Sequence, residues 1–281
     1  MEDLHLDNEQ GSEPKKVRGL AIAILVVLAA IAAVYYFATR KKPEAPTALQ
    51  TPPVESVTPA GGEKASAGGL GEPLAFPAVA LGESDPSVRD FAAALSANPE
   101  FAKWLLTKDL VRKFVVAVDN VANGLSPKPH IDFFSPSGQF RATRTKKGML
   151  LDEASYFRYD PVVGVVLSVD AVAAVRLYRA VKPLLQEAYR DLGYPGVDFE
   201  DTLVRAMTEL LETPIVDDPV VLEKKILSYA MVDETLEALS PAQKQLFRMG
   251  PKGVRAVHGK LRELAAALGV PESRLPQTKA K

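Results

Sequence analysis

The chain contains no cysteine and only three histidines, and these shortages exclude several kinds of chemistry. Without cysteine there can be no disulfide, no thiolate nucleophile and no cysteine-ligated zinc site. His5, His130 and His258 have no spacing suited to a metal ion. Neither a GxSxG elbow nor a glycine-rich phosphate loop occurs, which disfavours serine hydrolysis and nucleotide hydrolysis. We therefore expect no catalytic residue, no metal and no cofactor, and an enzyme is the less favoured class.

An excess of charge of one sign is also lacking. The 34 basic and 35 acidic residues leave a net charge of -1. Nothing global in this balance points to a polyanionic partner. Nucleic acid is therefore not expected as a partner.

Uncharged apolar runs are short except for one. Residues 20–38, LAIAILVVLAAIAAVYYFA, carry no charge, and a helix of this length spans about 30 Å of hydrocarbon. Basic residues flank the run, and Tyr35, Tyr36 and Phe37 lie where an interfacial aromatic belt is expected. A cleaved signal peptide normally has a shorter apolar core, of about 7 to 15 residues. The sequence therefore predicts an uncleaved transmembrane helix over residues 19–39, in contact with the lipid bilayer.

The orientation of this helix is not fixed by charge, because three basic residues stand on each side of it. A short polar tail before the first span, here residues 1–18, most often stays in the cytosol while the rest of the chain is exported. We expect a single-pass protein of the inner membrane with a periplasmic or otherwise extracytoplasmic domain. A cytosolic domain stays open as the alternative.

Residues 40–80 are rich in proline, glycine and alanine, and such a segment cannot bury enough apolar surface to offset its ordering entropy. It is predicted to be a disordered tether. About thirty of these residues give an end-to-end distance near 30 Å as a coil and roughly 90 Å as extended polyproline. The domain can therefore work well away from the bilayer.

Residues 81–269 carry repeated helix start and stop signals, which predict a mostly α fold, followed by a C-terminal tail over residues 270–281. Ser84 or Asp85 is expected to cap a first helix and Asn98 a second. A third helix, over LVRKFVVAVDNVANG, should end at Gly124.

The middle of the domain breaks this helical pattern. Short aromatic runs around a Ser-Pro-Ser-Gly turn at residues 135–138 predict a small β-hairpin. Asp152 should then cap a helix that stops before Pro161. Helices are expected to resume at Ser168, and Pro183 either kinks that helix or starts a second one.

The last part of the domain begins with a poorly periodic stretch, residues 220–239. Ser240 is expected to cap the next helix, with Gly250 after its end. Pro251 should open the last helix, which ends at Gly269.

Residues 184–214, LLQEAYRDLGYPGVDFEDTLVRAMTELLETP, read as a helical hinge. Gly193 can take the left-handed conformation, and Tyr194 should then pack back on Tyr189. Asp198 is placed to cap the next helix. The functional alternative is a cation site or an acid–base pair formed by four acids of this loop, Glu187, Asp191, Asp198 and Asp201. The structural interpretation is favoured because calcium loops space their ligands more regularly.

Charge is unevenly distributed in the second half of the chain. Residues 187–223 contain ten acidic and two basic residues, whereas residues 244–263 contain six basic and one acidic. Either the two segments neighbour each other in the fold, or the acidic face is offered to a basic partner.

Two further groups are candidate interaction surfaces. The first is the basic run Arg141, Arg144, Lys146 and Lys147, which is either a solvated hairpin face or a contact for lipid headgroups, anionic glycan or nucleic acid. The second is a ligand site or active site between helices, built from Tyr156, Arg158, Tyr159 and Asp160 together with the acids near Asp198.

The order of the strings LVRKFVVAVDNVANG, YFRYDPVV, LLQEAYRDLGYP, ALSPAQKQLFRMGP and KLRELAAAL resembles the bacterial family of the domain of unknown function 3014. The likeness covers about residues 81–268. It implies a bacterial membrane protein with one N-terminal anchor. It implies no activity and no catalytic residues.

Taken together, these patterns favour a non-catalytic interaction or scaffold module of the cell envelope. Its expected partner is an unidentified envelope protein or a cell-wall component, and a homo-oligomer stays open. One alternative is a small-ligand receptor or enzyme with a site between helices. Another is a lipid or polyanion binder acting through the basic run.

Overall fold

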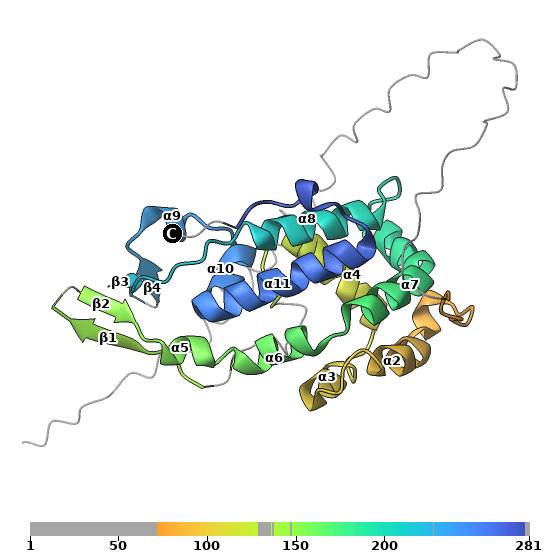
Figure 1. Cartoon of the computed structure of the whole chain (residues 1–281), viewed down its shortest axis with the longest axis horizontal. Coiled ribbons are helices and arrows are strands. Elements are labelled where there is room, and N and C mark those ends of the chain that lie inside the picture. Colours follow the sequence, from red (N-terminus) through yellow and green to blue (C-terminus); the bar gives the residue numbers. More distant parts are fainter. Residues whose placement is uncertain (1–71, 129–135, 137, 147, 227, 279–281) are drawn as a thin grey trace, which may run out of the picture. The chain divides into compact units, whose positions relative to one another are not determined.

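The computed structural model describes residues 72–128, 136, 138–146, 148–226 and 228–278, which fall within one compact unit of the chain. In this part the chain is mostly helical, with ten α-helices and a small antiparallel sheet (Figure 1). The helices are α2 (Asp85–Ala93), α3 (Pro99–Trp104), α4 (Leu110–Ala122), α5 (Ala154–Phe157), α6 (Asp160–Ser168), α7 (Ala171–Asp191), α8 (Phe199–Leu211), α9 (Glu234–Glu237), α10 (Pro241–Phe247) and α11 (Gly250–Leu268).

The predicted membrane anchor, residues 19–39, lies outside the described residues, as does most of the predicted tether. Among the helices that the structure describes, none is by itself long and apolar enough to cross a membrane. The pair α6 and α7 passes that test together on length and composition only, with a bend of 75° between the two helices.

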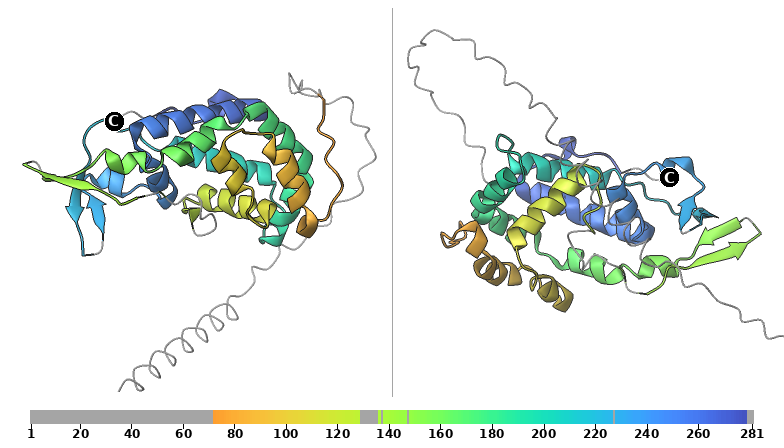
Figure 2. Two further views of the ribbon diagram at one scale, coloured as in Figure 1. Left: turned by 90° about the horizontal axis from the view of Figure 1, so that it is seen from below. Right: turned by 180° about the vertical axis from the view of Figure 1, so that it is seen from behind.

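Four helices, α4, α7, α8 and α11, enclose the main core (Figures 1 and 2). α7 packs against the other three, and α8 also packs against α4 and α11. The side chains of Val115, Tyr189, Phe199 and Leu211 are almost completely buried in this bundle. Burial of apolar surface at about 25 cal/mol per Å² makes this core the main source of stability.

α7 is one continuous helix with Pro183 inside it, so the proline does not start a second helix. The Asp170 carboxylate accepts a hydrogen bond of 2.7 Å from the Ala173 amide, which fixes the first residue of α7 at Ala171 rather than at Ser168.

The first two helices lie where the sequence predicts them, but one of their caps differs. Asn98 caps α3 by accepting from the Glu100 amide at 2.9 Å. The Asp85 carboxylate does not cap α2. It accepts instead from the Asp109 and Leu110 amides, at 2.7 and 2.8 Å, and so caps α4 from a distant part of the chain. This long-range capping joins α2 to α4.

The segment after the predicted hairpin differs from the expected single helix. α5 is one short turn, and α6 begins at Asp160 with Pro161 in its first turn. A proline is tolerated there because the first amides of a helix have no partner within the helix. Pro161 therefore starts a helix that the sequence does not indicate, instead of ending one.

The sheet has four antiparallel strands in the order β1 (Ala142–Thr145), β2 (Gly148–Leu151), β3 (Val221–Lys224) and β4 (Tyr229–Met231). β1 and β2 form a hairpin that turns between Thr145 and Gly148. The turn predicted at residues 135–138 lies partly outside the described residues. β3 and β4 form a second hairpin within residues 220–239, the stretch with little periodicity in its sequence. One face of the sheet packs on Leu236 and Phe247.

α10 begins at Pro241 and α11 ends before Gly269, as the sequence predicts, but α10 ends at Phe247 and α11 begins at Gly250 rather than at Pro251. Ser240 forms a capping box with Gln243 at the start of α10, and Gly269 closes α11 in the left-handed conformation. Leu275, in the predicted C-terminal tail, is buried in the main core. In the predicted tether, Leu74 and Phe76 pack against the same core.

Candidate functional site

The turn between α7 and α8, residues 192–198, is the corner that the sequence predicts as a hinge. Gly193 has a φ of +113°, and its amide donates to the Arg190 carbonyl at 3.0 Å. The Tyr194 amide donates to the Tyr189 carbonyl at 3.3 Å, which completes a Schellman ending. The rings of Tyr189 and Tyr194 stack with centroids 4.7 Å apart and planes 17° apart. The hinge prediction is confirmed in this detail.

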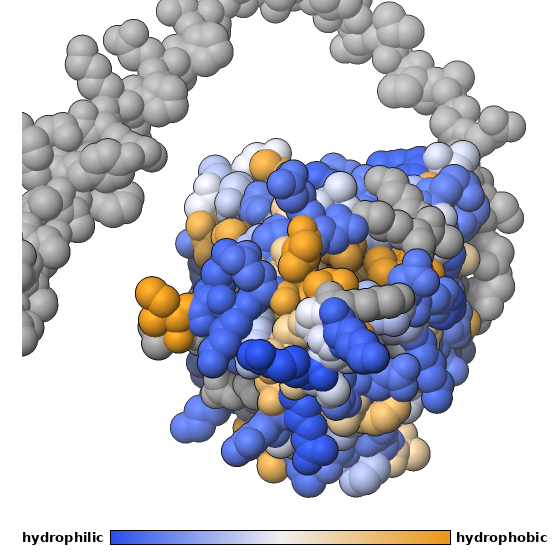
Figure 3. Space-filling model, turned by 90° about the vertical axis from the view of Figure 1, so that its left-hand side faces the viewer, coloured by the Kyte–Doolittle hydropathy of each residue, from blue (hydrophilic) through white to orange (hydrophobic). Residues whose placement is uncertain are grey.

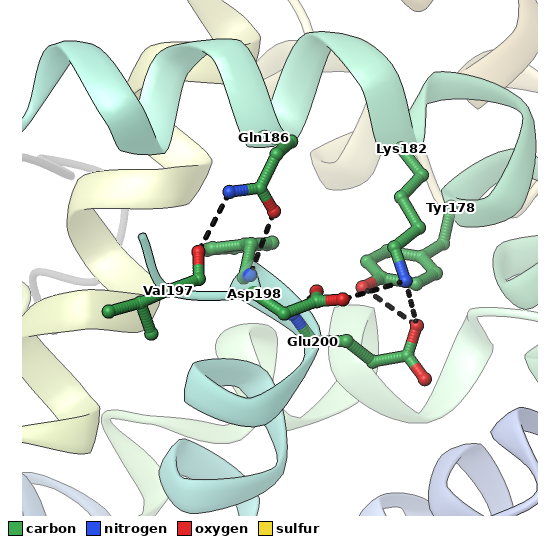
Figure 4. A network of polar contacts seen from close by, with 7 residues as sticks. Tyr178, Lys182, Gln186, Val197, Asp198 and Glu200 are labelled. Carbon is green, nitrogen blue, oxygen red and sulfur yellow. Dashed lines mark hydrogen bonds and ion pairs between the residues drawn. The ribbon is translucent and has the colours of Figure 1, made fainter. Parts of the chain in front are cut away.

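Two side chains fix the far end of this corner (Figure 4). The Asp198 carboxylate accepts from the Glu200 amide at 2.8 Å and caps α8 as predicted. The Gln186 side chain, on α7, donates to the Val197 carbonyl at 2.8 Å and accepts from the Phe199 amide at 3.0 Å. The corner is therefore held at both ends by directed hydrogen bonds.

We call the two hydrogen bonds of the Gln186 side chain the Gln186 clamp. A charged cluster beside this clamp links α7 to α8 (Figure 4). The Lys182 ammonium lies 2.8 Å from the Glu200 carboxylate and 3.5 Å from that of Asp198. Its hydrogen bond to Glu200 raises the pKa of Lys182. Burial, and then the charge of Glu200, raises the pKa of the Tyr178 hydroxyl. Lys182 therefore stays cationic and Tyr178 stays neutral near pH 7, which suits a structural brace and not a general base.

Four aromatic rings run through the corner from one exposed edge to another. Phe114, on α4, meets Phe199 edge to face at 6.1 Å, and Phe199 meets Tyr189 in the same way at 5.4 Å. Tyr189 then stacks on Tyr194. Phe199 and Tyr189 are fully buried, whereas Phe114 and Tyr194 are 45% and 37% exposed. The two ends of this aromatic row are thus available at the surface.

Two more apolar side chains are partly exposed in the turn that carries Tyr194. Leu192 and Val197 are 40% and 39% exposed. We call the group Leu192, Tyr194 and Val197 the corner surface. Asp191 lies next to it and pairs with Arg112 at 2.7 Å. Asp201 is exposed in the first turn of α8.

Asp119, on α4, is an acid of this region that the sequence alone does not single out. Burial raises the pKa of its carboxyl, and its charge raises the pKa of the Tyr194 hydroxyl. The Oδ1 atom of Asp119 is buried without a hydrogen-bond partner in the part of the chain that the structure describes. Its position four residues after Val115, next to the apolar stripe of α4, is the sequence signal that could have indicated it.

The second predicted group has mainly structural contacts. Tyr156 lies against the backbone of Gly250, and burial raises the pKa of its hydroxyl to about 12. Tyr159 is 5% exposed and belongs to a core between α6 and α11, with the Arg158 guanidinium 5.9 Å from its ring centroid. Asp160 is exposed in the first turn of α6.

The structure does not bring this group together with the acids near Asp198. Figures 1 and 2 place α5 and the α7–α8 corner at opposite ends of the compact unit. The predicted site between helices, which required both groups, is therefore not assembled within this unit.

The basic run lies on the first hairpin. Arg141, Arg144 and Lys146 are exposed there, and Lys147 lies outside the described residues. The Ser155 hydroxyl accepts from the Arg141 amide at 2.7 Å and donates to the Arg141 carbonyl at 2.8 Å, which ties the hairpin to α5. The second hairpin adds Lys224 and Lys225 to the same sheet, and both are exposed.

The acidic and basic segments of the second half are partly neighbours. α8 packs against α10 and α11, and Arg255 forms an ion pair with Asp217. Within the described ranges no group of three or more acidic or histidine side chains is placed to hold a metal ion.

Comparison with known proteins adds the family and no activity. The family model described as "Protein of unknown function (DUF3014)" matches residues 110–265, from the start of α4 almost to the end of α11. No curated protein and no solved structure matches the chain significantly. The match covers more than half of the chain, including the corner and the sheet, so the chain belongs to the DUF3014 family of proteins of unknown function.

Proposed function

We propose that this chain is a single-pass membrane protein whose helical domain is a non-catalytic interaction module of the cell envelope, and that it binds its protein partner through the corner surface. The observation that carries the proposal is the display of Leu192, Tyr194 and Val197 on a turn that is fixed at both ends. A fold needs a turn here, but it does not need three apolar side chains pointing partly to solvent.

The rigidity of the turn supports a binding role. The Schellman ending holds its first residues and the Gln186 clamp holds its last ones. A surface that is ordered before binding loses less conformational entropy when a partner arrives. The aromatic row beneath it provides a firm base, because Tyr189 and Phe199 are fully buried.

The chemistry of the surface indicates the kind of partner. Its centre is apolar and aromatic, which is typical of the central residues of protein interfaces. Two of the exposed carboxylates beside it, Asp191 and Asp198, are paired with Arg112 and Lys182. We infer a partner whose contact surface is mainly apolar, with polar groups at its rim.

The roles of the titratable groups support a non-catalytic module. Asp198 is a helix cap, Asp191 is paired with Arg112, and Lys182 is paired with Glu200. A general acid or base needs a free group within reach of a substrate and with a pKa near the working pH. These groups are instead used to hold α4, α7 and α8 together.

The membrane part of the proposal rests on the uncharged run of residues 20–38 and on the proline-rich segment that follows it. It is tested by fusing two reporters after Lys281, one active only outside the cytosol and one active only inside it. Activity of the outside reporter is expected. Activity of the inside reporter alone would contradict an exported domain and would direct the search to cytosolic partners.

The corner surface is tested by a pair of matched double variants of the full chain. Leu192→Ser with Val197→Arg changes the corner surface, and Leu106→Ser with Val172→Arg makes the same changes at other exposed positions, which are 72% and 46% exposed. After crosslinking in the native host, the first variant should retain about a tenth or less of the partner that the wild type retains, as expected for loss of central interface residues. The second variant should retain all of it. Equal retention by the two variants would refute the proposal, and matching thermal unfolding of both controls for folding.

A further inference from the structure

The two hairpins of the sheet project from the same end of it. β1 and β3 both run antiparallel to β2, so the turn after Thr145 and the turn after Lys224 leave the sheet at one end. Figure 2 shows the hairpins as two separate projections on one side of the compact unit. A flat surface could touch both at once.

Basic side chains gather at these two projections. The sequence has six basic residues and one acidic residue in ranges 141–151 and 221–232 together. Arg144 and Lys146 are exposed on the first hairpin, and Lys224 and Lys225 on the second. Glu223 is the acid, and it lies 2.5 Å from the Lys225 ammonium. The projections therefore present a net positive charge.

Exposed apolar side chains accompany the basic ones. Ile226 follows Lys225 in the second turn and is 98% exposed. Tyr229, opposite Lys224 in the strand register, is 39% exposed, and its ring lies 5.3 Å from that of Phe140. Figure 3 looks at this end of the unit and shows orange apolar patches between blue hydrophilic side chains, with one orange group standing out at the left edge.

The fold explains neither the basic side chains nor the exposed apolar side chains of the two projections. Lysines on edge strands can discourage pairing between sheets, but that does not account for an almost fully exposed isoleucine in the turn. Exposed isoleucine and tyrosine beside lysines are the combination that inserts into the headgroup region of an anionic bilayer, with the apolar groups among the acyl chains and the ammonium groups at the phosphates.

We propose that the two hairpin projections are a docking site for an anionic phospholipid surface. Arg144, Lys146, Lys224 and Lys225 meet the phosphates, and Ile226 enters the interface. Charge complementarity selects the partner, because anionic lipid headgroups attract basic side chains close to the bilayer surface. The predicted anchor also keeps a bilayer within the reach of a tether of about 30 to 90 Å. This site is separate from the corner surface, so either proposal can fail without the other.

The absence of cysteine in the chain allows a direct test. A single Ile226→Cys variant of the full chain, labelled with an environment-sensitive fluorophore, is measured with phosphatidylcholine vesicles that contain or lack phosphatidylglycerol. With the anionic lipid the fluorescence should rise at least about twofold, because insertion removes water from the probe. A nitroxide attached to the lipid should quench it. The control, Leu106→Cys on the loop after α3, should show neither change.

Two further measurements separate charge-driven docking from other causes. Raising the salt from about 0.1 M to about 1 M shortens the screening length from about 10 Å to about 3 Å and should abolish the response. Adding Lys224→Gln and Lys225→Gln to the labelled variant should weaken the response to anionic vesicles by about tenfold or more. An identical response with and without phosphatidylglycerol, or one that the nitroxide does not quench, would overturn the proposal. A response to an oligonucleotide or heparin equal to that with anionic vesicles would overturn it as well, in favour of a general polyanion site.

Discussion

The ring of Tyr194 lies stacked on the ring of Tyr189, although the first is 37% exposed and the second is fully buried. The contact forms because Gly193 reverses the chain at the end of α7 and places Tyr194 over the residue five positions before it. Tyr194 therefore has two roles: one face of its ring packs on Tyr189 at the end of α7, and the exposed part of the side chain belongs to the corner surface.

The left-handed conformation of Gly193 is expected to limit substitution there. In Gly193→Ala the new Cβ meets no atom within 4 Å, so the cost is conformational and should be about 1–2 kcal/mol. Gly196→Ala is the control in the same turn, because it also meets no atom and has no positive φ. It should change the free energy of unfolding by less than about 0.5 kcal/mol. Denaturant unfolding of the two variants checks the difference, and equal losses would contradict it.

The Gln186 clamp should matter more than the neighbouring ion pairs. Gln186→Ala removes two hydrogen bonds to the backbone of Val197 and Phe199, at a cost of about 1–2 kcal/mol. Lys182→Ala removes the ion pairs with Glu200 and Asp198. The side chains of Lys182, Glu200 and Asp198 are 38%, 39% and 51% exposed, so this loss should cost less than about 1 kcal/mol. Hydrogen exchange of residues 193–199 should accelerate in the first variant only. Acceleration in both would mean that the charged cluster, not the clamp, holds the turn.

Gly250 is expected to be the least replaceable glycine of α11. Its φ is +72°, and a Cβ would lie 2.6 Å from the Cγ atom of the Tyr156 ring. Gly250→Ala should therefore destabilise the fold by about 2 kcal/mol or more, through strain and overpacking. Gly259→Ala, in the same helix with open space around it, should stabilise the fold by about 0.5–1 kcal/mol. A thermal melt of each variant decides this, and a stabilising Gly250→Ala would exclude the close contact.

His258 should make stability depend on pH. It is 3% exposed, and burial lowers its pKa below 6.5. Its Nε2 lies 3.0 Å from the Leu210 carbonyl oxygen, so the neutral ring donates from Nε2. Below about pH 6.5 the unfolded chain therefore binds more protons than the folded chain. The contribution of the neutral His258 ring to the free energy of unfolding is fully present above about pH 6.5. It is lost as the pH falls toward the folded-state pKa, at up to about 1.4 kcal/mol per pH unit.

The comparison with His258→Gln isolates this effect. The difference in free energy of unfolding between the wild type and the variant should narrow between about pH 7.5 and pH 5, since only the wild type must protonate a buried imidazole. A difference that stays constant over this range would show that His258 is not the group responsible.

Much of the helical part could be predicted because its signals are local. A cap such as Ser240, a left-handed glycine such as Gly193 and a proline in the first turn act within a few residues, so their effects can be recognised in the sequence. The parts that could not be predicted depend on distant contacts. Asp85 caps α4 across 24 residues, and β3 forms because it pairs with β2, about seventy residues earlier in the chain.

The candidate surfaces show the same division. The hinge role of Asp198 and the stacking of Tyr194 were predictable from the order of residues around Gly193. The basic run of the first hairpin was visible too. Its relation to Ile226 was not, because only the sheet register places the two turns at one end. Asp119 became notable only through the burial of one carboxylate oxygen.

The most direct test of the proposed function is photo-crosslinking from the corner surface in living cells. A photoreactive amino acid replaces Val197 in the full chain, and a second version carries it at Leu106, which is more exposed but lies outside the corner. We expect a discrete protein adduct from position 197 and none from position 106, and the adduct should be lost when Leu192→Ser is added. No adduct from position 197, or the same adducts from both positions, would contradict the claim that the corner surface binds a partner.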